Sequence, residues 1–272
     1  RIFEGNGTDE IGRLANTFNK MLERLEGSFA MQKNFIANAS HEFRTPLTII
    51  QTELELAEKK LELFAADQTE MKSNGNEETL GFLSDSLKIA LTEIESLNKF
   101  TNDLFTIAKL DSAQTPMRFQ IFRIDELILE CIQNMKIPAE RKKIRINLLE
   151  NEPNEISADR DKIKSIILNL IDNAIKYTEM PSGKQNKEIF VESKKETASI
   201  MISVEDSGLG ISAADLPDIF NRFYRSNEIR SKEPGNGLGL SIVKDFIEMH
   251  SGSIQVESSL GKGTKFIVKL PA

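Results

Sequence analysis

The chain has 272 residues, enough for one large domain or two modest ones, and its hydrophobic (39%) and charged (28%) contents are those of an ordinary folded protein. Its formal net charge is −7, with acidic and basic residues interspersed, which argues against a nucleic-acid-binding protein because such proteins carry a basic face. Cys131 is the single cysteine, so an intramolecular disulfide is excluded. The sequence contains neither a signal peptide nor a run of about 18 apolar residues.

The first part of the chain, up to about residue 112, is expected to be helical throughout. Apolar residues recur there at alternating spacings of three and four, in series that begin at Ile11, Leu47 and Leu80. Such series predict the a/d seams of a coiled coil or helix bundle. The polar stretch AADQTEMKSNGNEE, with its Asn-Gly pair, is expected to be a loop that joins two antiparallel helices. Because a lone hairpin buries one stripe per helix, we expect a homodimeric four-helix bundle.

A histidine and a proline stand close together in one of these series, in ASHEFRTPLTII. Extending the seam of Leu47 backwards leaves His41 off the buried stripe, with Glu42 and Thr45 on the same exposed face. An exposed histidine beside a carboxylate is a candidate nucleophile, since the carboxylate can hold the Nδ1 proton and leave Nε2 free to attack. The alternative is a solvated histidine beside a tolerated proline. Pro46 is expected to bend the helix, because it lacks an N–H group.

The rest of the chain, from about residue 116, alternates between strand and helix patterns. FRIDELILECIQN predicts a strand and then a helix, with Asp125 as the N-cap. Alternating or β-branched runs predict further strands in KKIRINLL, KEIFVESKK, TASIMISVED, GSIQVES and GTKFIVKL. DKIKSIILNLIDNAIKY and LSIVKDFIEMH predict helices. The expected fold is an α/β sandwich with a largely antiparallel sheet on one side, and DSAQTPM is the expected linker before it.

One predicted helix of this second part carries a polar face in NLIDNAIKY. Asn169 and Asn173 stand four residues apart, and Lys176 and Tyr177 follow one turn on, so the face offers two amide oxygens, an ammonium group and an aromatic ring. Amide oxygens suit a hard cation such as Mg²⁺. The alternative is a pair of asparagines on an ordinary solvated face.

Glycine-rich turns follow this helix. EDSGLGI places Asp206 at the end of a predicted strand, and its glycines allow close backbone approach. GNGLGLSIV places glycines directly before a helix, where backbone N–H groups face anionic oxygens. GKGTKF is a weaker signal and is also compatible with a plain hairpin turn. The glycines are Gly208 and Gly210 in the first turn, Gly235, Gly237 and Gly239 in the second, and Gly261 and Gly263 in the third.

Taken in order, these motifs resemble the boxes of a HisKA-type sensor histidine kinase of two-component signalling. SHEFRTPL resembles the H box, NLIDNAIKY the N box, IFNRFYRS the F box, and DSGLG, GNGLGL and GKGTKF the three Gly boxes, in family order over about residues 30–272. DEIGRLANTFNKMLERL resembles the second helix of a HAMP signal-relay domain.

The resemblance implies a multidomain protein of α and α+β class. Residues 1–28 would be the C-terminal part of a HAMP domain, and residues 29–112 a dimerisation and phosphotransfer hairpin forming the four-helix bundle. Residues 117–272 would be a catalytic ATP-binding domain, an α/β sandwich of the histidine kinase, chaperone and gyrase type. The parent protein is expected to be anchored in the cell membrane through upstream segments missing here, which makes this chain its cytoplasmic portion.

The resemblance also implies roles for single residues. His41 would be the phosphoacceptor and Glu42 its polarising base, while Thr45 completes an E-x-x-T pattern that the family links to dephosphorylation of the partner. Asn173 would hold Mg²⁺ with Asn169 close by.

The remaining implied residues would surround ATP. Lys176 would reach phosphate, Tyr177 would border the base pocket, and Asp206 would receive the adenine amino group. The F box would anchor a mobile lid that runs to Gly235 and offers an arginine to the γ-phosphate. The other residues implied at the nucleotide are Gly208, Gly210, Arg222, Arg225, Arg230, Gly235, Gly237, Leu238, Gly239, Leu240 and Thr264.

The implied activity is autophosphorylation of a histidine from Mg-ATP and transfer of the phosphoryl group to an aspartate of a response regulator receiver domain. Phosphatase activity toward that regulator is expected too. One alternative is an ATP-binding signalling scaffold without phosphotransfer, against which His41 and the intact set of asparagine, aspartate and glycine residues argue. Another is an ATPase of the chaperone, gyrase and mismatch-repair superfamily, which lacks an H box on a helical hairpin.

Overall fold

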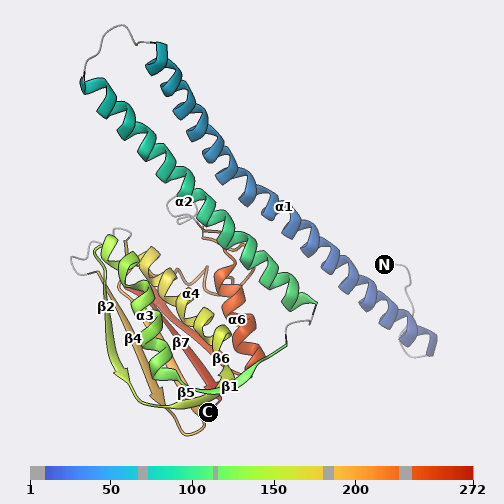
Figure 1. Ribbon diagram of the computed structural model, residues 1–272. Helices are drawn as coiled ribbons and strands as arrows, with labels where there is room; N and C mark the ends of the chain where they lie inside the picture. The colour runs from blue at the N-terminus through green and yellow to red at the C-terminus, as the bar shows by residue number, and fades with distance from the viewer. Residues whose placement is uncertain (1–9, 67–72, 113–115, 180–186, 227–234, 272) are drawn as a thin grey trace. The chain divides into compact units, whose positions relative to one another are not determined.

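The computed structural model describes residues 10–66, 73–112, 116–179, 187–226 and 235–271 (Figure 1). The chain divides into two compact units, Arg1–Phe100 and Thr101–Ala272. Each unit has its own pattern of burial.

Two long helices make up the first unit, and the end of the second helix belongs to the second unit. Helix α1 spans Glu10–Ala66 and helix α2 spans Ser73–Asp111. Pro46 lies inside α1 without ending it. The loop expected over residues 65–78 is shorter than predicted, because α2 already begins at Ser73 and includes the Asn-Gly pair. Helix propagation from the apolar repeat overrides the local turn signal there.

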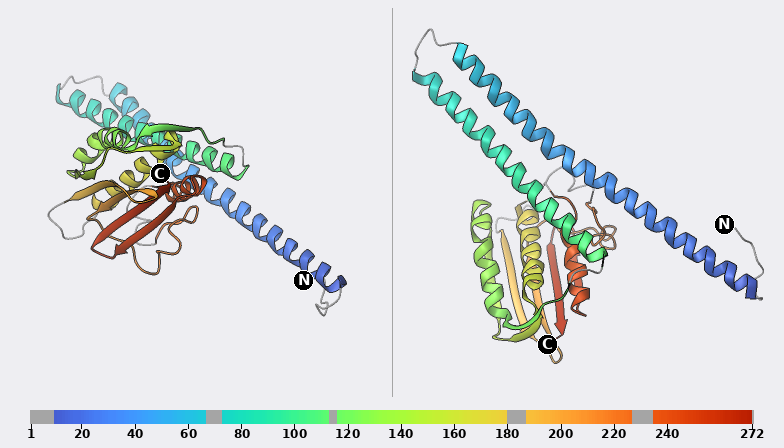
Figure 2. Two further views of the ribbon diagram at one scale, coloured as in Figure 1. Left: turned by 90° about the horizontal axis from the view of Figure 1, so that it is seen from below. Right: turned by 45° about the vertical axis from the view of Figure 1, so that its right-hand side comes forward.

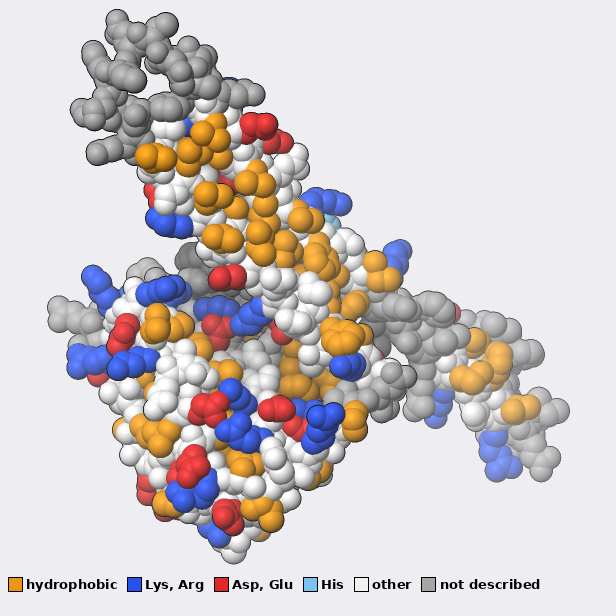
Figure 3. Space-filling model, viewed as in Figure 1, with side chains coloured by type: hydrophobic (Ala, Val, Ile, Leu, Met, Phe, Trp, Pro, Cys, Tyr) orange, Lys and Arg blue, Asp and Glu red, His pale blue; other side chains and the backbone are white. Residues whose placement is uncertain are grey.

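The two helices bury little between them. Small residues such as Ala57 and Ala90 are buried, and the rings of Phe43 and Phe100 lie 4.8 Å apart between centroids. Many larger apolar side chains stay exposed, and Figure 3 shows that hydrophobic side chains gather along the visible face of the helices. They are Leu14, Phe18, Met21, Ile36, Leu47, Leu54, Leu56, Leu61, Leu80, Phe82, Leu87, Ile89, Leu91, Ile94 and Phe105. Among the described helices, none is both long enough and apolar enough to cross a membrane.

The second unit is a two-layer α/β domain. Its helices are α3 (Ile124–Arg141), α4 (Arg160–Glu179) and α6 (Gly239–Met249). Its strands are β1 (Phe119–Arg123), β2 (Arg145–Asn151), β3 (Glu155–Asp159), β4 (Glu188–Lys195), β5 (Ser199–Asp206), β6 (Ser253–Ser259) and β7 (Gly263–Pro271). The three helices lie side by side over one face of the larger sheet (Figure 1 and Figure 2).

The larger sheet has the strand order β2-β4-β5-β7-β6, and its pairs are antiparallel except for the parallel pair of β2 and β4. This confirms the expected sandwich with a largely antiparallel sheet. Strands β1 and β3 pair antiparallel in a small sheet of their own. Strand β3 was not predicted from the sequence, because its five residues EISAD are too few to show a clear alternation of apolar and polar residues.

The core lies between the helices and the central strands. Ile200, Ile202 and Val204 of β5 are buried, and of the two residues between them Met201 is partly exposed whereas Ser203 is buried as well. Helix α4 meets them with Ile167 and Leu170, which have no exposed surface. Because α4 also contacts α3 and α6, its position is fixed on several sides. This matters because α4 carries the asparagines of NLIDNAIKY.

The start of α3 differs from the prediction. Asp125 is not the N-cap; Arg123 occupies that position without a capping side chain, and Asp125 lies within the first helical turn. Its carboxylate instead accepts hydrogen bonds from Arg123, at 2.6 and 2.8 Å, and from the backbone N–H of Asn154 at 3.3 Å. Asp125 is buried, so its negative charge must be compensated. The charge-assisted hydrogen bonds from Arg123 do this, and they form in place of the expected capping bond to the helix backbone.

Candidate functional site

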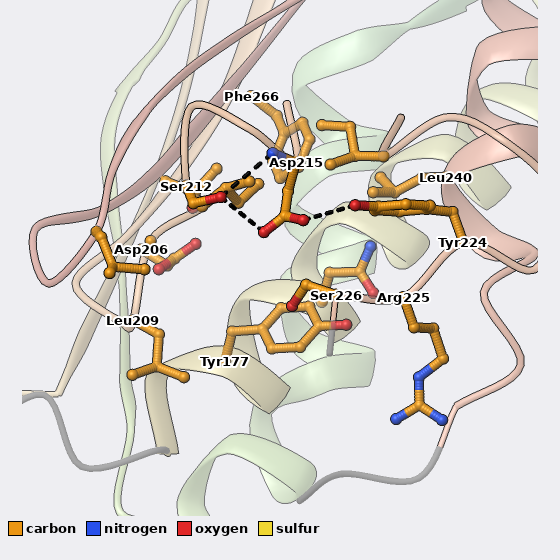
Figure 4. A pocket seen from close by; sticks show the side chains of 16 residues that line it. Tyr177, Asp206, Leu209, Ser212, Asp215, Tyr224, Arg225, Ser226, Leu240 and Phe266 are labelled. Atoms are coloured by element: carbon orange, nitrogen blue, oxygen red, sulfur yellow. Dashed lines mark hydrogen bonds between the residues drawn. The ribbon is translucent and has the colours of Figure 1, made fainter. Parts of the chain in front are cut away.

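A pocket with mostly apolar walls opens at the end of the larger sheet where β5 finishes and β7 begins (Figure 4). Residues of α4, the turn after β5, the segment before residue 227, α6 and β7 contribute to it. The lining residues are Asn173, Tyr177, Asp206, Leu209, Gly210, Ile211, Ser212, Asp215, Ile219, Tyr224, Arg225, Ser226, Leu240, Leu260, Thr264 and Phe266.

Strand pairing brings two polar residues of the pocket together. Asp206, the last residue of β5, stands opposite Thr264 near the start of β7, and both are buried. The Asp206 carboxylate accepts the backbone N–H of Gly208 at 2.8 Å. A Cβ atom on Gly208 would lie 2.4 Å from the carbonyl oxygen of Tyr177, so the glycine is required where the turn presses on α4. The turn therefore holds Asp206 beside the end of α4.

Asn173 presents its amide from α4 into the same pocket. Within the described part of the chain, that amide makes no hydrogen bond to another side chain or to the backbone. An amide that lines a pocket without a protein partner is free to bind a cation or a polar ligand group.

A backbone hydrogen bond closes the loop that borders the pocket. The N–H of Phe223 donates to the carbonyl of Gly237 at 2.9 Å, which joins the two ends of residues 224–236. Gly237 has φ +67°, and a Cβ atom there would lie 2.7 Å from the carbonyl carbon of Phe223. A residue with a side chain would therefore be both strained and obstructed. The expected lid beyond this point falls largely on residues 227–234, which lie outside the described residues.

Three side chains on the pocket wall form a hydrogen-bonded cluster. The hydroxyl of Tyr224 donates to Asp215 at 2.6 Å, and the hydroxyl of Ser212 donates to the other carboxylate oxygen at 2.8 Å (Figure 4). These bonds lower the pKa of Asp215. The same bond to Asp215, together with burial, raises the pKa of Tyr224 to about 12.

Comparison with known families places these features in one context. The chain matches the model of the histidine kinase-, DNA gyrase B- and HSP90-like ATPases over residues 158–272, the His kinase A (phospho-acceptor) domain over residues 31–113, and the HAMP domain over residues 1–27. It is 34% identical, over 259 residues, to the signal transduction histidine-protein kinase ArlS of Staphylococcus aureus (strain USA300), covering 95% of this chain and 53% of that protein. The chain thus spans about half the length of the curated relatives it matches.

The chain belongs to the sensor histidine kinases. Its fold is also that of solved members of the family. The Acinetobacter baumannii histidine kinase AdeS aligns with a TM-score of 0.60 at 22% identity, over 85% of this chain and 97% of that one. A crystal structure of the histidine kinase ThkA in complex with the response regulator protein TrrA aligns with a TM-score of 0.58 at 21% identity, over 97% of this chain and 68% of that chain.

In this histidine kinase, several residues expected at the nucleotide come together in the pocket. They are Asn173, Tyr177, Asp206, Gly210, Arg225, Leu240 and Thr264. Gly208 and Gly237 shape its rim, as described above. A Cβ atom on Gly239 would lie 3.0 Å from Oδ1 of Asn169, so the second Gly box packs directly on the N-box helix. Asn169 itself donates to the carbonyl of Ser165 at 2.9 Å and is not one of the residues that line the pocket.

Other expected residues have partners elsewhere. The ammonium group of Lys176 pairs with Asp172 at 3.0 Å, and Lys176 is not among the residues that line the pocket. Leu238 is fully buried, and its N–H donates to the side chain of Asn236 at 3.1 Å. Gly235 is exposed, and Arg230 lies outside the described residues.

Arg222 also turns away from the pocket lining. Its guanidinium donates two hydrogen bonds of 2.7 Å to Asp111 and stands 3.6 Å from Asp245, all within the second unit. These two carboxylates raise the pKa of Arg222, with the hydrogen bond to Asp111 as the main cause. An arginine held by two carboxylates is already compensated. Of the two described arginines proposed for the γ-phosphate, Arg225 is the one in the pocket.

His41 lies on α1, in the first unit, and its side chain is exposed as predicted. Glu42 is half-buried and Thr45 is exposed. The hydroxyl of Thr45 donates to the carbonyl oxygen of His41 at 3.4 Å. The helical turn therefore presents the imidazole to solvent with a carboxylate next to it in sequence and a hydroxyl one turn away.

The sequence reading missed Ser212, Asp215 and Tyr224 as pocket residues. A signal was available, since Ser212 and Asp215 form an S-x-x-D pattern of the kind found where helical turns begin. The backbone N–H of Asp215 indeed donates to Ser212 Oγ at 3.2 Å. Tyr224 stands inside the F box, but nothing local indicates that its hydroxyl reaches Asp215, nine residues before it.

Proposed function

We propose that this histidine kinase transfers the γ-phosphoryl group of Mg-ATP to His41 and then to an aspartate of a response regulator. The observation that carries the proposal is the pairing of two features in one chain. One is an exposed histidine on α1, and the other is a pocket that gathers seven of the residues expected at ATP. The chain's family membership supports binding of ATP by the second unit.

The pocket fits the two ends of a nucleotide. Asp206 is buried at an apolar end, where its carboxylate accepts the N–H of Gly208 and, with two oxygens, offers acceptor sites to an amino group. Tyr177, Leu209 and Phe266 supply flat or apolar surface for a base. At the other end, α6 begins within the second Gly box, at Gly239, and its N-terminus offers backbone N–H groups to phosphate oxygens.

The residues present also fit a magnesium ion bound with the nucleotide. The amide oxygen of Asn173 is a hard ligand that lines the pocket and accepts no hydrogen bond from the described residues, and Mg²⁺ takes its other ligands from phosphates and water. When bound, the ion supplies neutralisation of phosphate charge. Asn169 is the less suitable of the two expected ligands, because its amide already donates to Ser165 and packs on the second Gly box.

His41 supplies the nucleophile in the proposed reaction. The lone pair of Nε2 forms the bond to phosphorus, the bond to the bridging oxygen breaks, and ADP leaves. Glu42, the next residue, is placed to hold the Nδ1 proton and keep the reactive tautomer. Exposure of His41 is required because the nucleophile and the nucleotide pocket belong to different units.

We further propose that a response regulator receives the phosphoryl group and that two copies of this chain pair through α1 and α2. The solved complex of ThkA with the response regulator TrrA supports a partner of that class. The exposed apolar stripes of the two helices support a homodimer, because a single hairpin leaves them in water. The HAMP match supports a parent protein anchored in a membrane.

Incubation with γ-labelled ATP and Mg²⁺ tests the proposal. We expect a label on the protein that is lost in acid and retained in base, as phosphohistidine is. His41→Gln should abolish the label while leaving binding of a non-hydrolysable ATP analogue within about twofold of the parent, because the pocket is in the other unit. A label that survives in His41→Gln, or an acid-stable label, would contradict the assignment. Light scattering should give twice 30.6 kDa, and a monomer would contradict the dimer.

A further inference from the structure

The cluster of Ser212, Asp215 and Tyr224 uses both oxygens of one pocket carboxylate (Figure 4). Tyr224 donates to Oδ1 and Ser212 to Oδ2. All three residues line the pocket. The cluster therefore links two parts of the pocket wall. One is the segment after β5, which carries Ser212 and Asp215, and the other is the segment that carries Tyr224.

The ring of Tyr224 is held at both ends. Its backbone follows Phe223, which has φ +63° and an N–H bonded to the carbonyl of Gly237. Its hydroxyl is bonded to Asp215. Between these two points the ring forms part of the wall, together with Leu240 and Ile219. Because a tyrosine side chain has two rotatable angles, fixing the backbone and the hydroxyl fixes the orientation of the ring.

The two hydrogen bonds also compensate the negative charge of the Asp215 carboxylate. Asp215 and Asp206 both line a pocket that would receive a polyanionic nucleotide. An uncompensated second carboxylate would repel that ligand, and the two hydroxyl donors disperse its charge. The raised pKa of Tyr224 keeps the phenol protonated, and the lowered pKa of Asp215 keeps it an acceptor, throughout the neutral range.

We propose that Tyr224, held by Asp215, is a positioning residue that sets the affinity of the pocket for the nucleotide and takes no part in phosphoryl transfer. The proposal rests on the function proposed above. It assigns to Asp215, outside the boxes, a role in nucleotide binding through its hydrogen bond to Tyr224. Loss of either partner frees the ring and leaves the wall unformed.

Single and double variants of the full chain test the proposal. In Tyr224→Phe and in Asp215→Ala we expect Kd for a Mg²⁺-loaded non-hydrolysable ATP analogue, and KM for ATP in autophosphorylation, to rise about fivefold. We expect kcat to stay within about twofold. The double variant should be no weaker than the weaker single variant, because both remove the same bond. Asp215→Asn, which keeps an acceptor for the phenol, should lose less affinity than Asp215→Ala.

Asp218→Ala is the matched control. Asp218 lies in the same turn, pairs with the side chain of Asn221 at 2.8 Å, and is not among the pocket-lining residues. It should change neither Kd nor KM. Melting temperatures of all variants separate a loss of affinity from a loss of folded protein.

The inference would be overturned by unchanged Kd and KM in both single variants, by fully additive losses in the double variant, or by a fall of kcat at constant KM. Losses that merely follow the folded fraction in every variant, the control included, would also overturn it. Failure of the parent chain to bind the analogue is a different result, because it removes the proposed function itself.

Discussion

The two units of this kinase use the same apolar periodicity to different ends. In the second unit, Ile167 and Leu170 of α4 have no exposed surface, because the sheet and the neighbouring helices cover them. In the hairpin, Leu54 and Leu87 occupy equivalent seam positions and remain 49% and 53% exposed. An amphipathic helix thus predicts a buried stripe without saying what buries it. The ATP-binding unit completes its core internally, whereas the hairpin leaves its stripe for another surface.

The chemistry divides along the same line. The hairpin presents His41 in the open, where a partner can reach it. The second unit encloses Asp206, Thr264 and Asn173 in a pocket whose shape depends on packed glycines. One unit therefore offers the proposed nucleophile and the other the proposed nucleotide site, and variants in each should fail in different ways.

Asn173→Asp should give the largest effect. A carboxylate at this position adds negative charge beside the proposed phosphate site, so we expect autophosphorylation to fall about 100-fold, consistent with loss of one electrostatic contact at a reacting group. The proposed dimer should persist, since the hairpin is untouched. Asp161→Asn, at an exposed position on the same helix, is the control. Initial rates of label uptake and light scattering check both points, and loss of the dimer would argue against the division of roles.

A substitution in the core of the second unit and one in the apolar stripe of the hairpin should have different effects on unfolding. Leu170→Ala removes a fully buried side chain and should lower the free energy of unfolding of the second unit by about 2–5 kcal/mol at any protein concentration. Leu54→Ala should weaken the proposed dimer, so that unfolding of the hairpin depends less on protein concentration than in the parent chain, because a smaller share of the variant is dimeric. Urea unfolding at two concentrations measures both, with Glu58→Ala as the exposed control. A concentration-independent effect of Leu54→Ala would mean that this leucine faces no partner.

Acid should weaken the second unit through Asp125. Hydrogen bonds from Arg123 lower the pKa of this carboxyl below its ordinary value. Its stabilising contribution is therefore full above the unfolded-state pKa, about 4, and is lost as pH falls through the folded-state pKa. Asp125→Asn should cost about 1–2 kcal/mol at pH 6 and progressively less toward pH 2. Denaturation across that range checks the sign, and a gap that widens in acid would contradict it.

Thr45→Ala should have the smallest effect on the fold. Thr45 is exposed and makes one long hydrogen bond to its own helix, so its loss should cost at most about 0.5 kcal/mol. We expect dephosphorylation of the phosphorylated regulator to slow much more than label uptake from ATP, because the hydroxyl lies one turn from His41 and far in sequence from the pocket residues. Both rates should be measured on one preparation. Equal losses, or unchanged dephosphorylation, would leave Thr45 as an ordinary surface residue.

The sequence by itself predicted most of the elements and the exposed position of His41. Helix and sheet periodicity are local properties, and they predicted α4, α6 and the five strands of the larger sheet. The turns of the Gly boxes could likewise be predicted, because a turn that passes close to another backbone segment requires glycine, and glycine is visible in the sequence. The order of the motifs, a property of the chain alone, led to the family that the comparisons confirm.

The tertiary structure determined which groups the charged and polar side chains pair with. Lys176 pairs with Asp172 and Arg222 pairs with Asp111, whereas Tyr224 reaches Asp215 across the pocket wall. Strand β3 exists because β1 is there to pair with it. The physical reason is common to all of these. Periodicity and turn chemistry act over a few residues, while a hydrogen bond or ion pair forms wherever the fold brings two groups within about 3 Å, and that distance is set by the whole packed domain.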